Sequence, residues 1–244
     1  MFLDIWKVFV CVVTTTYVTA KIPSYINVCG RKDSNYDQCL AENIKNMKDK
    51  ICTGFPEFNI PPIEPLMFDK IVIFETKDLK LYLRDVNVYG FCDYVVNSIQ
   101  TNPERLHFDI NILFQQLYIN STYDFDMRLL VRVTNKGPVE AVIESVRMKS
   151  DIDLKTITKN NKKHIFASKV NNFIDTKSFT YKFLDDSKEL AQLHKILSDV
   201  IDNNKKEIIR AVKSRVEEKA SRIIILIFNG IARSNYEQIF PEKT

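Results

Sequence analysis

The sequence predicts an α+β fold in which a highly curved antiparallel β-sheet wraps around one long C-terminal α-helix. From Phe68 to Leu184, apolar residues alternate with polar or charged ones over long stretches, as expected of strands that are covered on one face. From Ser187 to about Arg233, apolar residues recur at helical spacing, with no proline and with no glycine before Gly230. A shorter helical stripe precedes the strands, so the prediction adds a short N-terminal helix.

Residues 1–20 have the pattern of a cleavable signal peptide. An apolar run from Val8 to Val13 is followed by small or β-branched residues that end at Ala20. The run is too short to cross a bilayer, which takes about 20 apolar residues. We therefore expect cleavage after Ala20 and a secreted protein whose residues 21–244 form a single lipophilic-ligand-binding domain. A buried N-terminal helix is the alternative, because Asp4 and three threonines weaken the pattern.

Composition narrows the class of protein. The chain is 27% charged with a net charge of only +4, and the two signs are interspersed, which does not indicate a nucleic-acid partner. With 45% apolar residues, it is long enough to hide about 70% of its unfolded surface in a core. The fold therefore does not depend on disulfides in the way that a small scaffold does.

The cysteines indicate an oxidising compartment. Loss of the leader removes Cys11 and leaves an even set: Cys29, Cys39, Cys52 and Cys92. Four cysteines permit three pairings. Neither a C-x-x-C motif nor nearby histidines accompany them, so we expect no metal and no redox pair. The pattern favours a covalent staple for Cys29 and Cys39, and it leaves open whether Cys52 is bridged to Cys92 or is a buried thiol.

The N-terminal helix is predicted between residues 35 and 54. Its apolar stripe consists of Leu40, Ile44, Met47 and Ile51, with Asn35 or Asp33 as N-cap and Gly54 as the stop. Cys39 then lies in the first turn, where a bridge to Cys29 would hold the N-terminal segment against the helix. The following "GFPEFNIPPIEPL" has four prolines within ten residues, which predicts an extended, stiff connector.

The strands are predicted from alternation with period two. The expected segments are 71–74, 79–84, 86–88, 106–114, 123–133, 139–154, 164–170 and 173–184. Turn signals are sparse and include "NKGP" and "KNNKK", so the strands must be long. The sequon Asn120-Ser121-Thr122 is an N-glycosylation acceptor, and it predicts an exposed loop between two strands.

The C-terminal helix is predicted to be far longer than usual. If unbroken, it exceeds 40 residues, or about 60 Å, and a bend is expected at Asp202–Asn204. A coiled coil is the alternative, but the spacing is not a strict heptad. A strongly curved sheet and a cylinder rarely match along their whole length. We therefore expect an apolar tunnel between them, suited to an elongated apolar ligand.

The order of motifs resembles the insect takeout and haemolymph juvenile hormone binding protein family. The similar segments are "KIPSYINVCGRKDSNYDQCL", "GFPEFNIPPIEPL", "DVNVYG", "FLDDSKELAQLHKILSDVIDNNKKEI" and "SNYEQIFPEKT". The resemblance covers nearly all of the mature chain. It implies a secreted, non-catalytic carrier of juvenile hormone or another lipophilic molecule. It also implies a long helix wrapped by a curved antiparallel sheet, an apolar cavity and one disulfide near the N-terminus.

The sequence also departs from that family. Hormone-binding members carry a second bridge farther along the chain, whereas here no cysteine follows Cys92, which favours the takeout branch. Cys52 and Cys92 are outside the common pattern. Asn135-Lys136-Gly137 stands where the family often has a Gly-x-Gly turn, so we expect a reshaped turn there.

The favoured function is therefore a monomeric carrier with an internal tunnel for a juvenile hormone-like terpenoid, a fatty acid or a similar molecule. The candidate lining residues share strand faces: Phe108, Ile110, Ile112, Phe114, Tyr123, Phe125, Met127, Leu129 and Val131. Tyr123 has a phenol that could bond to a polar group of the ligand. For each residue, ordinary core packing is the competing interpretation. We expect no cofactor and no stable membrane insertion.

Two other classes of function are alternatives to the carrier. One is a protein- or membrane-interaction module that uses the long helix as its surface. The other is a secreted esterase, which is disfavoured because no G-x-S-x-G motif occurs and the three histidines have no local partner motif: His107, His164 and His194.

Overall fold

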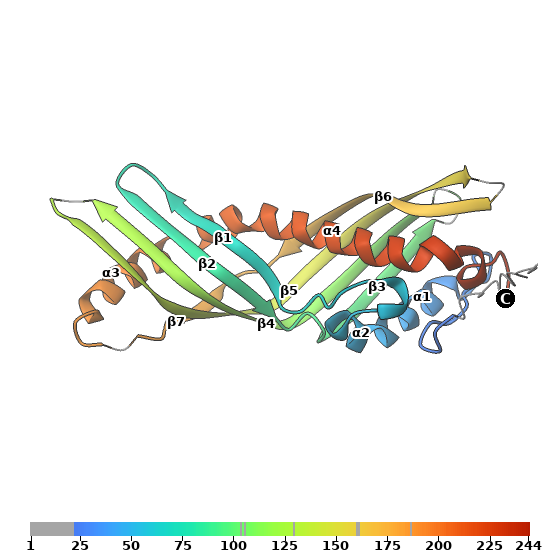
Figure 1. Cartoon of the computed structure of the whole chain (residues 1–244), viewed down its shortest axis with the longest axis horizontal. Helices are drawn as coiled ribbons and strands as arrows, with labels where there is room; N and C mark the ends of the chain where they lie inside the picture. Colours follow the sequence, from blue (N-terminus) through green and yellow to red (C-terminus); the bar gives the residue numbers. More distant parts are fainter. Residues whose placement is uncertain (1–21, 103, 105, 129, 160–161, 186) are drawn as a thin grey trace, which may run out of the picture.

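The computed structural model describes residues 22–244 except 103, 105, 129, 160–161 and 186, so the predicted signal peptide lies outside the described residues. The elements, drawn in Figure 1, are α1 (Tyr36–Asn46), α2 (Lys48–Thr53), a 3-10 turn η1 (Pro56–Phe58), β1 (Leu66–Glu75), β2 (Leu79–Tyr89), β3 (Tyr94–Asn102), β4 (His107–Arg128), β5 (Arg132–Lys159), β6 (Lys162–Asp175), β7 (Phe179–Phe183), α3 (Ala191–Asn203) and α4 (Lys205–Ile239). The predicted α+β class is confirmed: a curved antiparallel sheet covers a long C-terminal helix, and a short tethered helix precedes it.

Two very long strands form the middle of the sheet. β4 pairs with β5 along its whole length, from His107 with Asp153 to Arg128 with Arg132, and β5 continues beyond it to Lys159. The outer edge of β4 is shared by two partners, since β3 pairs with its first half and β2 with its second, and β1 extends the sheet beyond β2. The outer edge of β5 is likewise shared by β7 and β6. The sheet can therefore be long although only two of its strands run along most of its length.

Bulges accompany the curvature of the sheet. The register shifts within the pairs β1 with β2, β2 with β4, β3 with β4, and β5 with β6. A bulge places an extra residue on one strand, which bends that strand and increases its twist. Asp85 lies in the bulge of β2 and has a φ of +51°, a left-handed conformation that an aspartate tolerates better than a bulky residue would.

Helix α4 lies along the concave side of the sheet and contacts two of its edge strands, β1 and β6 (Figure 1). Side chains of α4 accept hydrogen bonds from the free backbone edge of β6. The amide of Ala167 donates to Asn229 Oδ1 at 2.8 Å, and that of Ile174 donates to Glu217 Oε1 at 2.7 Å. Arg215 donates to the carbonyl of Lys70 on β1 at 3.5 Å. The helix thus satisfies polar groups of edges that would otherwise be exposed.

The predicted bend in the C-terminal helix is confirmed. α3 ends at Asn203 and α4 begins at Lys205, with Asn204 between them at φ −125° and ψ 22°. The Asn204 side chain donates to the carbonyl of Val200 at 2.7 Å, which caps the end of α3. α4 then runs for 35 residues to Ile239, past the predicted end.

The turn between β4 and β5 is not where the sequence indicated. The predicted strand 123–133 contains the hairpin turn, because β4 ends at Arg128, β5 begins at Arg132, and these two arginines pair. The predicted turn at Gly137 lies within β5 instead, opposite Tyr123. Apolar residues continue their alternation through the turn, which contains no glycine or proline, so the pattern resembled one strand.

Two further expectations fail locally. Asn120 has an exposed side chain, but it lies inside the continuous strand β4, paired with Asn87 and Glu140, and not in a loop. In the proline connector, Pro56–Phe58 form a 3-10 turn where an extended segment was predicted. Strand β3 was not predicted, because its alternation is weak in "YVVNSIQTN".

Two disulfides hold the N-terminal helices. Cys29 and Cys39 are bridged with Cα atoms 5.8 Å apart, and Cys52 and Cys92 with Cα atoms 6.0 Å apart. The first ties α1 to the loop before it, and the second ties α2 to the segment between β2 and β3. The N-terminal loop also binds the C-terminal tail, because the amide of Cys29 donates to the carbonyl of Ile239 at 2.8 Å.

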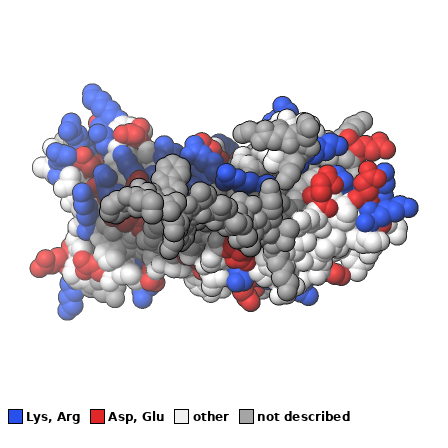
Figure 2. All heavy atoms as spheres, turned by 45° about the vertical axis from the view of Figure 1, so that its right-hand side comes forward, with Lys and Arg blue, Asp and Glu red and all other residues white. Residues whose placement is uncertain are grey.

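The outer surface carries both signs of charge. Figure 2 shows acidic and basic side chains interspersed at both ends of the face in view. None of the helices in the described part of the chain is long and apolar enough to span a membrane.

Candidate ligand cavity

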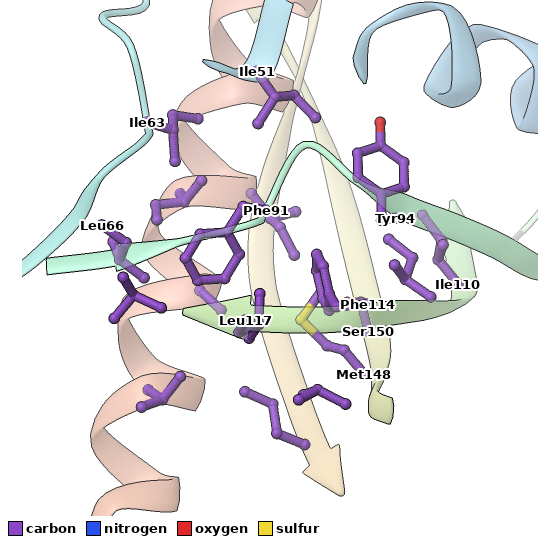
Figure 3. A pocket seen from close by; sticks show the side chains of 18 of the residues that line it. Ile51, Ile63, Leu66, Phe91, Tyr94, Ile110, Phe114, Leu117, Met148 and Ser150 are labelled. Atoms are coloured by element: carbon purple, nitrogen blue, oxygen red, sulfur yellow. The ribbon is translucent and has the colours of Figure 1, made fainter. Parts of the chain in front are cut away.

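A cavity of about 420 Å³ lies between the concave face of the sheet and the helices. This volume is within the range of about 300 to 1,000 Å³ that is common for small-molecule sites. Figure 3 shows aliphatic and aromatic side chains that converge on it, among them Phe91, Phe114, Leu117 and Met148. The interior is therefore suited to a hydrocarbon-rich ligand.

Period-two alternation along β4 builds one wall. Phe108, Ile110, Ile112 and Phe114 all line the cavity. The lining then continues at Leu117 and Ile119, so the inward-facing residues change from even to odd numbers. The change occurs where β4 exchanges its edge partner β3 for β2. Phe108 to Phe114 and Tyr123 to Met127 therefore both face inward, although they have even and odd numbers, respectively.

The long helix forms the opposite wall. Apolar residues of α4 at spacings of three and four line the cavity: Ile208, Val212, Val216, Ala220, Ile223, Ile224, Ile227 and Ile231. Leu40 and Ile44 of α1 close it near the first disulfide, and Ile51 and Ile63 close it near the second. Cys39 precedes Leu40 and Cys52 follows Ile51, so the two disulfides hold the part of the lining that α1 and α2 contribute.

The predicted lining residues divide into two groups. The four from Phe108 to Phe114 lie on the cavity, whereas Tyr123, Phe125 and Met127 do not line it and pack in the core farther along β4. Val131 is 72% exposed, because it lies in the hairpin turn. Leu129 is outside the described residues.

Tyr123 is held by the protein itself. Its hydroxyl donates to Asn135 Oδ1 at 2.8 Å and lies 3.0 Å from His194 Nε2 on α3. Its ring packs edge to face against the ring of Phe183, with the two ring centroids 5.1 Å apart. Burial raises the pKa of this phenol. The hydroxyl thus links α3 to the sheet through contacts within the protein.

The cavity has few polar lining residues: Tyr36, Asn43, Tyr94, Ser150, Thr176, Lys213 and Tyr236. Tyr94 donates to the carbonyl of Ile44 at 2.5 Å, and Figure 3 shows its hydroxyl pointing away from the neighbouring apolar side chains. No sequence pattern indicated these residues as a group. They come from distant segments and share no spacing. One feature that could have indicated a member of this group is the position of Tyr36 at the start of the predicted helix.

Two of the three histidines have side-chain partners in the described part of the chain. His107 lies 2.7 Å from Asp153 and 3.3 Å from Asp109, and His194 contacts Tyr123. Within the described ranges, neither imidazole is hydrogen-bonded to a serine hydroxyl. Cys52, Cys92 and Glu64 lie close together, but the two sulfurs are joined in the disulfide, so they are not free thiolates for a metal.

The chain is similar in sequence to one protein family and in structure to solved proteins. Residues 8–241 match the family described as haemolymph juvenile hormone binding protein (JHBP). No curated protein sequence matches the chain. The structure is similar to Takeout 1 of Epiphyas postvittana, with a TM-score of 0.67 and 14% identity over 85% of this chain and 95% of that one. A lipopolysaccharide binding protein gives a TM-score of 0.39 and 10% identity over 65% of this chain and 33% of that one.

Proposed function

The chain belongs to the haemolymph juvenile hormone binding protein family, and from this premise we propose that it is a non-catalytic carrier of one elongated lipophilic ligand. The observation that carries the proposal is the apolar cavity of about 420 Å³ between the sheet and α4. Burial of apolar ligand surface there would contribute roughly 25 cal/mol per Å². The cavity would act as a tunnel along the helix, with a terpenoid or a fatty-acid derivative as occupant.

We further propose that the protein is secreted and acts as a monomer of the takeout type. Two disulfides support secretion, because such bonds persist in oxidising compartments. Asn120 has an exposed side chain on the outer face of β4, so a glycan could be accommodated there. Mass spectrometry of protein from a secretory host, before and after glycosidase treatment, tests occupancy of this site.

Ligand extraction tests the carrier function directly. Native mass spectrometry of the purified protein is expected to show a co-purified apolar molecule. After delipidation, the protein should bind the neutral fluorescent probe N-phenyl-1-naphthylamine saturably and with one site. Failure of the delipidated, folded protein to bind this probe or any terpenoid or fatty-acid derivative would reject the proposal. Binding to liposomes with the cavity empty would favour an interaction module instead.

A cavity-filling variant locates the binding site. Ala220 lines the cavity on α4, whereas Ala211 lies exposed on the same helix. Ala220→Trp is expected to weaken probe binding at least tenfold, because the indole occupies the space of the ligand. Ala211→Trp, the matched control, should leave the affinity unchanged. Equal affinities of the two variants in a fluorescence titration would place the ligand elsewhere.

A further inference from the structure

We propose that the turn between β4 and β5 is a docking tip, which consists of Leu130 and Val131 with the flanking Arg128 and Arg132, and that it binds the surface of a phospholipid bilayer reversibly. Two chemistries recognise the bilayer: hydrocarbon receives the apolar side chains, and phosphate receives the guanidinium groups. None of these four residues lines the cavity, so docking is independent of the ligand that the cavity holds.

The docking tip has the most exposed large apolar side chains in the described part of the chain. Leu130 is 103% exposed and Val131 is 72% exposed. β4 ends at Arg128 and β5 begins at Arg132, so both apolar residues stand in the turn itself. Figure 1 shows this turn at one extreme of the long axis, opposite the end that holds α1 and α2. Leu130 and Val131 therefore project beyond the packed body of the fold.

The needs of the turn do not explain these residue types. A short connection between antiparallel strands commonly includes a residue in the left-handed conformation, usually glycine or asparagine. The turn here has neither, and Val131 is β-branched, which disfavours a turn position. Folding does not bury Leu130 or Val131 either, because both stay exposed in the folded chain. Apolar residues that neither the turn nor the core requires indicate a surface that another structure covers.

Cationic side chains directly follow the apolar ones. Arg128 and Arg132 are cross-strand partners, so their exposed side chains leave the same face of the hairpin. Arg132 is paired with Asp126 at 2.8 Å, whereas Arg128 forms no ion pair among the described residues. The amide of Arg128 donates to the carbonyl of Asp78 at 2.8 Å, which places the β1–β2 turn and its exposed Lys77 beside the docking tip.

This order of groups fits a bilayer. From the end of the hairpin inward come two apolar side chains, then guanidinium groups, then a strand surface of mixed charge. A phospholipid leaflet presents hydrocarbon, phosphate and water in the matching order, and arginine binds phosphate oxygens in a bidentate manner. Two side chains are too few for a stable protein interface, which buries about 1,000 Å² or more. They are also too few for permanent anchoring, so the contact is reversible.

Flotation with vesicles of phosphatidylcholine and phosphatidylserine tests the apolar part of the contact. Wild type is expected to float with the vesicles. The double variant Leu130→Asn, Val131→Gly should bind at least about tenfold more weakly, because it removes two apolar side chains that enter hydrocarbon. Asparagine followed by glycine favours a tight turn, so the variant should fold as well as wild type.

Met67→Gln is the matched control, because it removes a side chain that is 62% exposed on β1. This variant should float as wild type does. Wild type that does not float, or an equal loss in Met67→Gln and the double variant, would overturn the inference.

The role of the guanidinium group needs a separate variant. Arg128→Gln is expected to weaken binding to the mixed vesicles about three- to tenfold and to affect pure phosphatidylcholine vesicles less, because an arginine near an anionic surface contributes modestly to binding. Arg222→Gln removes an exposed arginine of α4 beside η1 and should leave binding unchanged. An equal effect of the two variants would mean that a weakly basic protein is attracted without a defined tip, which rejects the assignment.

Tryptophan fluorescence tests insertion itself. Trp6 is the only tryptophan of the chain, so Leu130→Trp in a Trp6→Phe background carries a single indole at the docking tip. Addition of vesicles should shift its emission to shorter wavelength, and lipids brominated on their acyl chains should quench it. An unshifted and unquenched emission would contradict insertion. A dimer that forms without vesicles and disappears in Leu130→Asn, Val131→Gly would assign the tip to a second copy of this chain and overturn bilayer docking.

Probe binding keeps this inference separate from the carrier function. All of these variants should bind N-phenyl-1-naphthylamine saturably in the absence of vesicles, as wild type does, because the substituted residues lie outside the cavity lining. A folded protein that floats with vesicles but never binds the probe would reject the carrier function and leave docking supported. A protein that binds the probe but does not float would do the reverse.

Discussion

At the scale of single residues, Gly137 and Tyr123 form a close cross-strand pair. A Cβ added at Gly137 would lie 2.8 Å from Cε1 and 2.9 Å from the hydroxyl of Tyr123. The glycine is therefore required for space between paired strands and not for a turn. It lets the buried tyrosine lie flat against β5 while its hydroxyl reaches Asn135 and His194.

Gly137→Ala is predicted to lower the free energy of unfolding by about 1–3 kcal/mol, because the new methyl group overpacks the site. Urea denaturation measures the change. In a Tyr123→Ala background, where the ring is absent, the same substitution should cost much less. Equal costs in both backgrounds would mean that the ring is not the obstacle.

His107 should contribute stability that depends on pH. Its hydrogen bond to Asp153, followed by that to Asp109, raises the pKa of the imidazole, and Lys149 is the nearby cation that pairs with Asp109. A raised folded-state pKa stabilises the fold below the unfolded value of about 6.5, and this contribution disappears as the pH rises through the folded value. The difference in Tm between wild type and His107→Gln is thus predicted to be larger at about pH 5.5 than at about pH 8.5.

Thermal melts at the two pH values check this prediction. His164→Gln is the control, because among the described residues its imidazole forms no ion pair with a carboxylate. A His107→Gln difference that is the same at both pH values would contradict the assigned partners.

At the scale of elements, the β6 edge is completed by side chains of α4. An edge strand exposes unpaired amides that attract other strands. Here Asn229 and Glu217 accept hydrogen bonds from two of those amides. In addition, the side chain of Asn172 on β6 donates to Ser221 Oγ at 2.9 Å. The helix therefore binds the sheet through hydrogen bonds at one edge, while its apolar stripe faces the cavity. This division lets α4 stay in place although protein side chains leave a cavity beside it.

Glu217→Ala is predicted to lower the free energy of unfolding by about 1–3 kcal/mol and to speed hydrogen exchange of the Ile174 amide, because that amide loses its charged acceptor. Exchange measured by NMR reports the individual amide. Glu217→Gln keeps an oxygen at the same position and should retain most of the protection. Unchanged exchange in Glu217→Ala would show that the contact does not restrain β6.

At the scale of the whole molecule, the two disulfides constrain segments of different length. Cys29 and Cys39 are separated by 10 positions, whereas Cys52 and Cys92 are separated by 40. The longer loop loses more freedom in the unfolded chain when it is closed. The second bridge also joins α2 to the sheet, so it fixes the connector between them.

Replacing Cys52 and Cys92 together by serine is predicted to cost about 4 kcal/mol, against about 3 kcal/mol for the same change at Cys29 and Cys39, from the loop-closure entropy. Guanidinium denaturation of the two double variants gives the comparison. A larger loss at Cys29 and Cys39 would mean that native-state contacts of the N-terminal loop outweigh the entropy of the unfolded chain.

The candidate site could be predicted only in part. Phe108 to Phe114 were identified because alternation shows which face of a strand is apolar. Tyr123 and Phe125 satisfy the same pattern yet pack in the core, since alternation does not distinguish a filled interior from a hollow one. The polar lining residues Tyr36 and Tyr236 were not identified together, because they lie near opposite ends of the chain and share the cavity only in the folded structure.

The sequence by itself determined the features that depend on neighbours along the chain. These are the period-two strands, the helical stripe, its break near Asn204 and the cysteines available for pairing. Only the tertiary structure decided where β4 turns into β5, which half of each long strand receives which partner, and where the cavity lies. A cavity is the difference in shape between a curved sheet and a helix, and that difference is defined only when the two surfaces are packed together.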